Sequence, residues 1–243
     1  MQSDMIESCA AQFAHAHLTG QIDALPLLPE TAADAFAIQS ATIARLGVVG
    51  GWKHGLIGGR DLACAPILKA EVHHSGTLQP HLRGLRIEVE TAFLLGKDIA
   101  PDATFKAIID AIDDVHIAFE CLRTRFVTPT GHTPLELMAD RFTNHSIVIG
   151  DAIANWRNRD LAALAITTNF APARTRAAPG MSLDQSVDFL GFLARRAAEL
   201  GLPLSAGQYV ITGARLGPIP LTTPGTLHAE INRARVEMTV TAA

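Results

Sequence analysis

The chain has 243 residues, of which 48% are hydrophobic and 18% are charged, and its formal net charge is −4. This size and composition predict a globular protein with one large core or two small ones. Both signs of charge are spread along the sequence, so there is no basic stripe for a nucleic-acid backbone and no polybasic anchor for a membrane surface. We therefore expect neither nucleic acid nor a membrane as a partner.

The N-terminus and the cysteines indicate the compartment. No apolar run reaches the roughly 18 to 20 residues of a membrane span, and the first residues, MQSDMIESC, are acidic where a signal peptide would be basic. These features predict a cytoplasmic protein. Cys9, Cys64 and Cys121 are odd in number and lack CxxC spacing. Free thiols are therefore expected, rather than a disulfide framework or a zinc site.

The first 47 residues predict two amphipathic, alanine-rich helices, over about 3–18 and 32–46. Thr31 and Asp34 have the spacing of a capping box at the start of the second helix, and Gly47 is a typical stop. We expect residues 1–47 to form a helical N-terminal part, and residues 48–243 to form a β-rich catalytic body in one compact unit.

After Gly47 the sequence changes to short apolar strands separated by glycine and proline. The predicted strands are VVGGWKHGLIG, RIEVETAFLL, DDVHIAFECL, HSIVIG, QYVITG and LHAEINRARVEMTV. The last is expected to be one long antiparallel strand, because charged and apolar residues alternate from Arg233 to Met238. Further helices are predicted over about 104–112 and 184–200, and a loop over 171–182. The fold class is thus α+β.

Two glutamates stand out in RIEVETAFLL, residues 86–95. Alternate side chains of a strand share a face, so Glu88 and Glu90 project together from an otherwise apolar strand, with Cα atoms about 7 Å apart. Two like charges at that distance require solvent, protonation or a bound cation. Glu120 lies on the polar face of a second apolar strand. Three carboxylates suit Mg²⁺ or Mn²⁺, while the pair alone is also typical of a solvated strand edge.

Six segments follow one another over nearly the whole chain: DAFAIQ, GGWKHGL, IEVETAFLLGKDI, HIAFECLRTRF, ADRFTNHSIVIG and GLPLSAGQYVITGARLGP. In this order they resemble the 2-keto-4-pentenoate hydratase branch of the fumarylacetoacetate hydrolase superfamily. The resemblance implies a helical N-terminal part on a mixed β-roll. It also implies a divalent cation, Mg²⁺ or Mn²⁺, bound by an ExE pair and a third acid. By position, Glu88, Glu90 and Glu120 become the metal ligands.

The same resemblance implies a substrate-binding role for four residues. The segment ITGA matches the turn that holds substrate in the family, so Thr212, Gly213 and Ala214 would bind the substrate carboxylate through backbone N–H groups and a hydroxyl. A simple strand-ending turn is the alternative. Arg125 matches an arginine that follows the third acid of the family motif, and a structural ion pair is the alternative for it.

Lys53 matches a lysine that lies near the metal in the family and moves protons or holds substrate charge. Its neighbours Trp52 and glycine could desolvate it, which lowers the pKa of a lysine; a surface lysine is the alternative. Between Lys53 and Glu88 the chain is shorter than the family, in the segment that carries a second acid/base residue. Four residues are open as replacements: Asp61, Glu71, His73 and His74.

Two arginines depart from the family pattern. Arg123 and Arg141 stand where the resemblance leads us to expect an aspartate and an asparagine. Arginines near a carboxylate-binding site would favour a diacid substrate through charge-assisted pairing, or they would form surface ion pairs.

The resemblance implies a metal-dependent lyase, a hydratase or a decarboxylase, that acts on a 2-oxo-enoic acid as in aromatic meta-cleavage catabolism. A 2-oxo acid can chelate a cation, which then stabilises negative charge on the keto oxygen. The alternatives are an acylpyruvate-type C–C bond hydrolase on the same scaffold, or a catalytically degenerate partner subunit of a decarboxylase or hydratase. The apolar N-terminal helices and the family predict a homo-oligomer.

Overall fold

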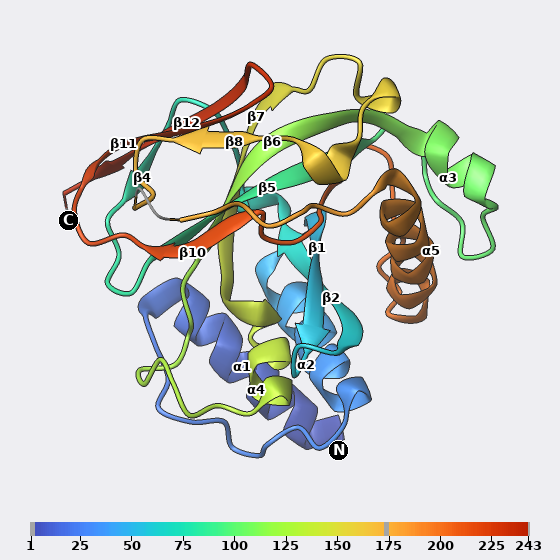
Figure 1. The fold of residues 1–243 in the computed structure, drawn as a ribbon. Helices are drawn as coiled ribbons and strands as arrows, with labels where there is room; N and C mark the ends of the chain where they lie inside the picture. The colour runs from blue at the N-terminus through green and yellow to red at the C-terminus, as the bar shows by residue number, and fades with distance from the viewer. Residues whose placement is uncertain (1–2, 173–174, 243) are drawn as a thin grey trace.

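The computed structural model describes residues 3–172 and 175–242, and shows a helical part packed beneath a body of curved sheets (Figure 1). Helices α1 (Ser3–Thr19) and α2 (Ala32–Leu46) pack against each other, and α2 also contacts α4 (Pro134–Ala139). The predicted capping box is present at α2, because the Thr31 hydroxyl accepts a hydrogen bond from the backbone of Asp34, whose carboxylate accepts one from the backbone of Thr31. Gly47 ends the helix.

The larger sheet has the strand order β2-β1-β9-β5-β6-β7-β3, and β10 pairs with β5. Its strands are β1 (Val49–Ile57), β2 (Asp61–Leu68), β3 (Val72–His74), β5 (Arg86–Leu95), β6 (Ile112–Leu122), β7 (Asn144–Ala152), β9 (Tyr209–Ile211) and β10 (Leu216–Pro220). The central pairs β5–β6 and β6–β7 are antiparallel, whereas β1–β9 and β3–β7 are parallel. The sheet is therefore mixed, as the resemblance implies.

A smaller sheet has the order β4-β12-β11-β8, and its strand β12 packs on β6 and β7 of the larger one. The strands are β4 (Thr77–Pro80), β8 (Ile166–Thr168), β11 (Gly225–Ile231) and β12 (Ala234–Thr241). Alternate apolar residues of β12, Val236, Met238 and Val240, are buried in the main core. The two sheets thus enclose the main core, while a smaller apolar cluster around Ile67, Ala118 and Ile147 lies on the larger sheet.

The remaining helices lie at the edge of the body. Helix α5 (Leu183–Glu199) contacts α3 (Phe105–Ala111) and runs beside β1 and β2 in Figure 1. Ser182 caps α5 in a capping box with Gln185. Four short 3₁₀ turns are η1 (Lys69–Glu71), η2 (Arg141–Thr143), η3 (Trp156–Asn158) and η4 (Leu161–Ala163). Among the described residues, no helix is long and apolar enough to cross a membrane. The three cysteines are free and buried.

Most predicted elements are present within a few residues of their expected ends. The strands β2, β3, β4, β8 and β10 and the helix α4 were not predicted, and most of them are only three to six residues long. In the expected loop over 171–182, residues 173 and 174 lie outside the described residues, and the described part has no helix or strand.

The prediction of one long strand over 227–240 is wrong, because the segment forms a hairpin. Strands β11 and β12 pair from Gly225 with Val240 to Ile231 with Ala234. The two loop residues, Asn232 and Arg233, have φ values of 49° and 75°. Positive φ at both central positions is the geometry of a tight hairpin turn. Asparagine tolerates it, but arginine gives no turn signal in the sequence.

This turn yields a stability prediction. Replacing Arg233 by glycine removes the steric cost of positive φ, so the free energy of unfolding should rise by about 0.5 to 1 kcal/mol. Arg235→Gly is the matched control, since Arg235 lies in β12 and glycine there should lower stability. Urea denaturation of both variants checks the pair. A lower midpoint for Arg233→Gly would contradict the turn.

Candidate active site

The three predicted metal ligands converge at the centre of the larger sheet. The antiparallel register of β5 and β6 sets Glu88 opposite Glu120 and Glu90 opposite Ala118. One carboxylate oxygen from each of the three glutamates lies within 4.8 Å of the other two. Glu90 and Glu120 are each 1% exposed, and Glu88 is half-buried. The solvated strand edge considered for this pair is therefore not what the structure shows.

Each buried carboxylate is held from one side. Glu120 Oε1 accepts hydrogen bonds from Lys53 Nζ at 2.5 Å and from Asn144 Nδ2 at 2.7 Å. Glu90 Oε2 accepts one from the backbone N–H of Gly213 at 2.7 Å. The second oxygen of Glu120 is buried and has no hydrogen-bond partner among the described residues. These contacts orient the carboxylates and leave oxygen atoms free between them.

The cluster is short of positive charge. Burial, followed by the charge of Glu120, raises the pKa of Glu88 to about 7, and the same causes raise the pKa of Glu90 well above its ordinary value. Lys53 is the one cationic side chain among the described residues that line the site, and one ammonium group does not balance three carboxylates. Such a cluster holds protons or a cation.

A hard divalent cation fits these residues. Carboxylate oxygens are the ligands that Mg²⁺ and Mn²⁺ prefer, and the unpartnered buried oxygen of Glu120 is a free acceptor at the cluster. A positive charge there would favour the ionised forms of Glu88 and Glu90. The donor set offers protein ligands from one side only, which suits an ion that keeps waters or substrate on the other.

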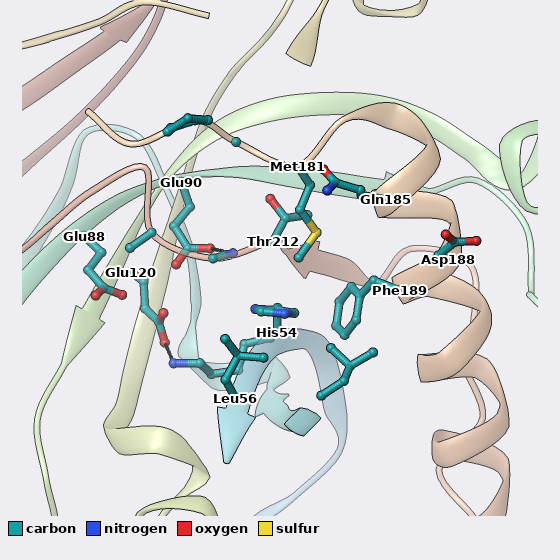
Figure 2. Close-up of a pocket in the computed structure, with 16 residues that line it drawn as sticks. His54, Leu56, Glu88, Glu90, Glu120, Met181, Gln185, Asp188, Phe189 and Thr212 are labelled. Atoms are coloured by element: carbon teal, nitrogen blue, oxygen red, sulfur yellow. Dashed lines mark hydrogen bonds and ion pairs between the residues drawn. The ribbon is translucent and has the colours of Figure 1, made fainter. Parts of the chain in front are cut away.

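The carboxylates form one wall of a cavity of about 640 Å³ (Figure 2). Lys53 and the turn at 212–214 adjoin them. The opposite wall comes from α5 and the segment before it, with Met181 and Phe189 as its apolar side chains, and Leu56 and Leu62 close the rim. The cavity therefore has a charged end and an apolar end.

Lys53 lies inside the protein, which rules out the alternative of a surface lysine. It is 5% exposed on β1 and pairs in register with Ile211 of β9, the residue before the turn. Its ammonium group reaches Glu120 and lies 3.4 Å from the carbonyl oxygen of Phe142. The parallel β1–β9 pair thus brings the lysine and the turn to the same end of the cavity.

The turn at 212–214 is more than the end of a strand, because it supports Glu90. The N–H groups of Thr212 and Gly213 donate to Thr91 O and to the Glu90 carboxylate, and the Thr212 hydroxyl lies 2.9 Å from that of Thr91. Gly213 has φ of 105°, a conformation that favours glycine. All three turn residues line the cavity.

Arg125 does not line the cavity, so the structure gives no support to a substrate-binding role for it. Its guanidinium group is buried, lies 3.3 Å from Asp140 Oδ1 and donates to the backbone carbonyls of Arg123 and Asn144. A buried guanidinium needs such partners to offset its desolvation. Arg125 is therefore a structural ion pair, the alternative considered for it.

Arg141 is also occupied elsewhere. Its guanidinium donates to both oxygens of the buried Glu71, at 2.6 and 2.8 Å, and Glu71 also faces His17 of α1. Neither Arg123 nor Arg141 lines the cavity. The suggestion that these arginines favour a diacid is therefore not supported at this site.

None of the four candidate replacements for the missing acid/base residue lines the cavity. Glu71 is paired with Arg141, Asp61 is exposed, and His73 and His74 lie on β3 at the far edge of the sheet. The structure instead brings His54 into the cavity, beside Lys53. Adjacent residues of a regular strand face opposite ways, so the sequence pattern around Lys53 gives no signal for His54.

Comparison with known proteins agrees with the fold. No family model matches the chain. A 2-keto-4-pentenoate hydratase from Paraburkholderia xenovorans (strain LB400) is 28% identical over 143 residues, which are 58% of this chain and 52% of the relative. The chain thus spans about half the length of the curated relatives that it matches.

Solved structures extend the likeness to the whole chain. A 4-oxalocrotonate decarboxylase from Pseudomonas putida G7, complexed with magnesium and adipate, covers 99% of both chains at a TM-score of 0.83 and 20% identity. A proposed fumarylpyruvate hydrolase from Burkholderia cenocepacia aligns over 81% of this chain and 89% of its own length, with a TM-score of 0.56 and 13% identity. This chain has the fold of the fumarylacetoacetate hydrolase superfamily. The α+β class and the resemblance to the 2-keto-4-pentenoate hydratase branch are confirmed.

The raised carboxylate pKa values predict how metal binding depends on pH. Without metal, the pKa of Glu88 in the folded protein is about 7 against an ordinary 4.5, so folding favours the protonated form. The metal-free protein should lose stability as pH rises from about 4.5 to about 7. Since Mg²⁺ competes with this proton, the rise in Tm that it causes should be larger at pH 8 than at pH 6.

Differential scanning fluorimetry with and without Mg²⁺ measures both effects. Glu88→Gln should abolish the difference between the two pH values, while Glu199→Gln, an exposed glutamate at the end of α5, should keep it. An equal Mg²⁺ shift in all three proteins would contradict a metal site at these glutamates.

Proposed function

We propose that this protein is a divalent-metal-dependent lyase that hydrates a 2-oxo-4-enoic acid. The observation that supports this most is the convergence of three buried carboxylates, an ion-paired lysine and a backbone turn at one end of a cavity. The curated relatives, at 27 to 30% identity, are all named hydratases. They favour a lyase over a C–C bond hydrolase.

Glu88, Glu90 and Glu120 would hold Mg²⁺ or Mn²⁺. When bound, such an ion acts as a Lewis acid toward the carboxylate and keto oxygens of a 2-oxo acid. The turn would orient the substrate carboxylate, since the N–H of Ala214 makes no hydrogen bond within the described part of the chain. The buried Lys53 would deliver a proton from its ammonium form, or remove one in its amine form, at the carbon next to the keto group.

The cavity favours a substrate with one carboxylate. Apart from the glutamates, Lys53 and the turn at 212–214, its described lining is apolar except for His54 and the polar residues Gln185 and Asp188 of α5. No second cationic group among these residues would hold a distal carboxylate, and the exposed Asp188 would repel it. A hydratase of a mono-acid is therefore preferred to a decarboxylase of a diacid.

The proposal also includes cytoplasmic location and self-association, with a decarboxylase subunit as a possible partner. Large apolar side chains are exposed on the N-terminal part, where Leu18 is 76% and Leu28 47% exposed. Covering them in an assembly would remove apolar surface from water. Light scattering should give a mass well above 25.9 kDa. A monomer at micromolar concentration would contradict self-association.

Lys53→Ala tests the proposed reaction. If Lys53 transfers protons, the rate of Mg²⁺-dependent hydration of 2-hydroxypenta-2,4-dienoate should fall by about 10²- to 10⁴-fold. The stabilisation by Mg²⁺ should persist, because the lysine is not a ligand. Lys106→Ala, which removes an exposed lysine of α3, is the control and should keep the full rate.

The test of Lys53 requires that the wild-type protein hydrates the substrate. If the wild-type protein hydrates no 2-oxo-4-enoic acid with Mg²⁺ or Mn²⁺, the proposed function is wrong. If it does, and Lys53→Ala keeps the wild-type rate while remaining folded by circular dichroism, the role of Lys53 is wrong.

A further inference from the structure

Hydration needs two proton transfers of opposite direction at neighbouring atoms of the substrate. Water adds to carbon 4 of the conjugated acid and must lose a proton there, while carbon 3, next to the keto group, must gain one. Lys53 is held against Glu120 at the charged end of the cavity. An ammonium group can give a proton to carbon 3 but cannot take one from water in the same step, so a second group is needed as the base.

His54 lines the same cavity. Figure 2 shows its ring in the middle of the site, with the glutamates on one side and Phe189 on the other. The two rings meet edge to face, with centroids 5.0 Å apart and an interplanar angle of 80°. A Cβ added to Gly213 would lie 3.3 Å from His54 Nδ1, so the glycine leaves room beside this nitrogen.

The surroundings keep the imidazole neutral and available. Burial, and then the charge of Lys53, lowers the pKa of His54 to about 4, and no hydrogen bond contributes to the shift. The other charged groups of the cavity are the three glutamates on β5 and β6 and the exposed Asp188 on α5. At neutral pH the ring therefore has one donor and one acceptor nitrogen, free to meet water or substrate.

We propose that His54 is a second proton-transfer residue, acting on the water that adds to carbon 4. The inference rests on the proposed hydration. His54 would take the place of the second acid/base residue that the resemblance leads us to expect in the shortened segment between Lys53 and Glu88. None of Asp61, Glu71, His73 and His74 lines the cavity, whereas His54 does.

The step balances with the two residues acting together. 2-Hydroxypenta-2,4-dienoate first loses the proton of its 2-hydroxyl group and gains one at carbon 5, which gives the conjugated 2-oxo-3-enoate with its C3=C4 bond. The unprotonated ring nitrogen of His54 then takes a proton from water as the water oxygen bonds to carbon 4. The electron pair of the C3=C4 bond then takes a proton from the Lys53 ammonium group and forms the new C3–H bond. The proton on His54 returns to Lys53 through solvent, so the net change is the addition of one water.

His54→Gln tests this assignment, because the amide keeps hydrogen bonding but acts as neither an acid nor a base near neutral pH. With Mg²⁺, hydration of 2-hydroxypenta-2,4-dienoate should fall by about 10²- to 10⁴-fold. Deuterium exchange at carbon 3 of 2-oxopentanoate, followed by NMR in D₂O, requires no addition of water. It should stay close to the wild-type rate in His54→Gln and be lost in Lys53→Ala.

His74→Gln is the matched control, since this histidine lies on β3 outside the cavity; both of its rates should equal those of the wild type. The Tm rise with Mg²⁺ should be the same in His54→Gln as in the wild type.

Three results separate the possibilities. If the wild type hydrates the substrate and His54→Gln does so at an equal rate, the role of His54 is overturned and the proposed function still stands. Parallel loss of hydration, exchange and Mg²⁺ stabilisation in His54→Gln also overturns it, since the residue would then be structural. Absence of hydration in the wild type overturns the proposed function itself.

Discussion

The register between β5 and β6 is the constraint on which the site depends. It sets Glu88 opposite Glu120 and leaves Glu90 one step along the same face, so three carboxylates meet inside the sheet. A shift of one residue would turn Glu88 and Glu90 to the opposite face. The register is fixed by the alternate apolar residues of β5, since Ile87, Val89 and their partners on β6 pack into the core.

Two groups of buried charged residues differ in how they are balanced. At the cavity, one lysine faces three carboxylates, and the remaining negative charge is what a divalent ion would balance. Beneath the sheet, the pairs Glu71–Arg141 and Arg125–Asp140 are matched one to one. Removing one member of such a pair leaves a buried charge and is strongly destabilising. The matched pairs stabilise the structure, and the unmatched glutamate cluster is suited to bind a cation.

The cavity is assembled from distant parts of the chain. The β1–β9 pair brings Lys53 beside the turn at 212–214, and α5 adds the apolar wall that carries Phe189. His54 reaches the cavity because its strand, β1, lies next to both the turn at 212–214 and α5. A chain that is short between Lys53 and Glu88 can therefore still place a titratable group in the cavity, from a strand rather than from the shortened segment.

The sequence by itself determined the helices, the main strands and the carboxylate face, because these follow from local periodicity, from capping and from the period of two along a strand. It also named Lys53 and the turn at 212–214. Only the tertiary structure decided that Glu120 meets the ExE pair and that His54 faces the cavity. It also decided that Arg125 pairs with Asp140 and that Arg141 pairs with Glu71. These are contacts between residues far apart in sequence, and they depend on strand register and charge pairing, which no local pattern encodes.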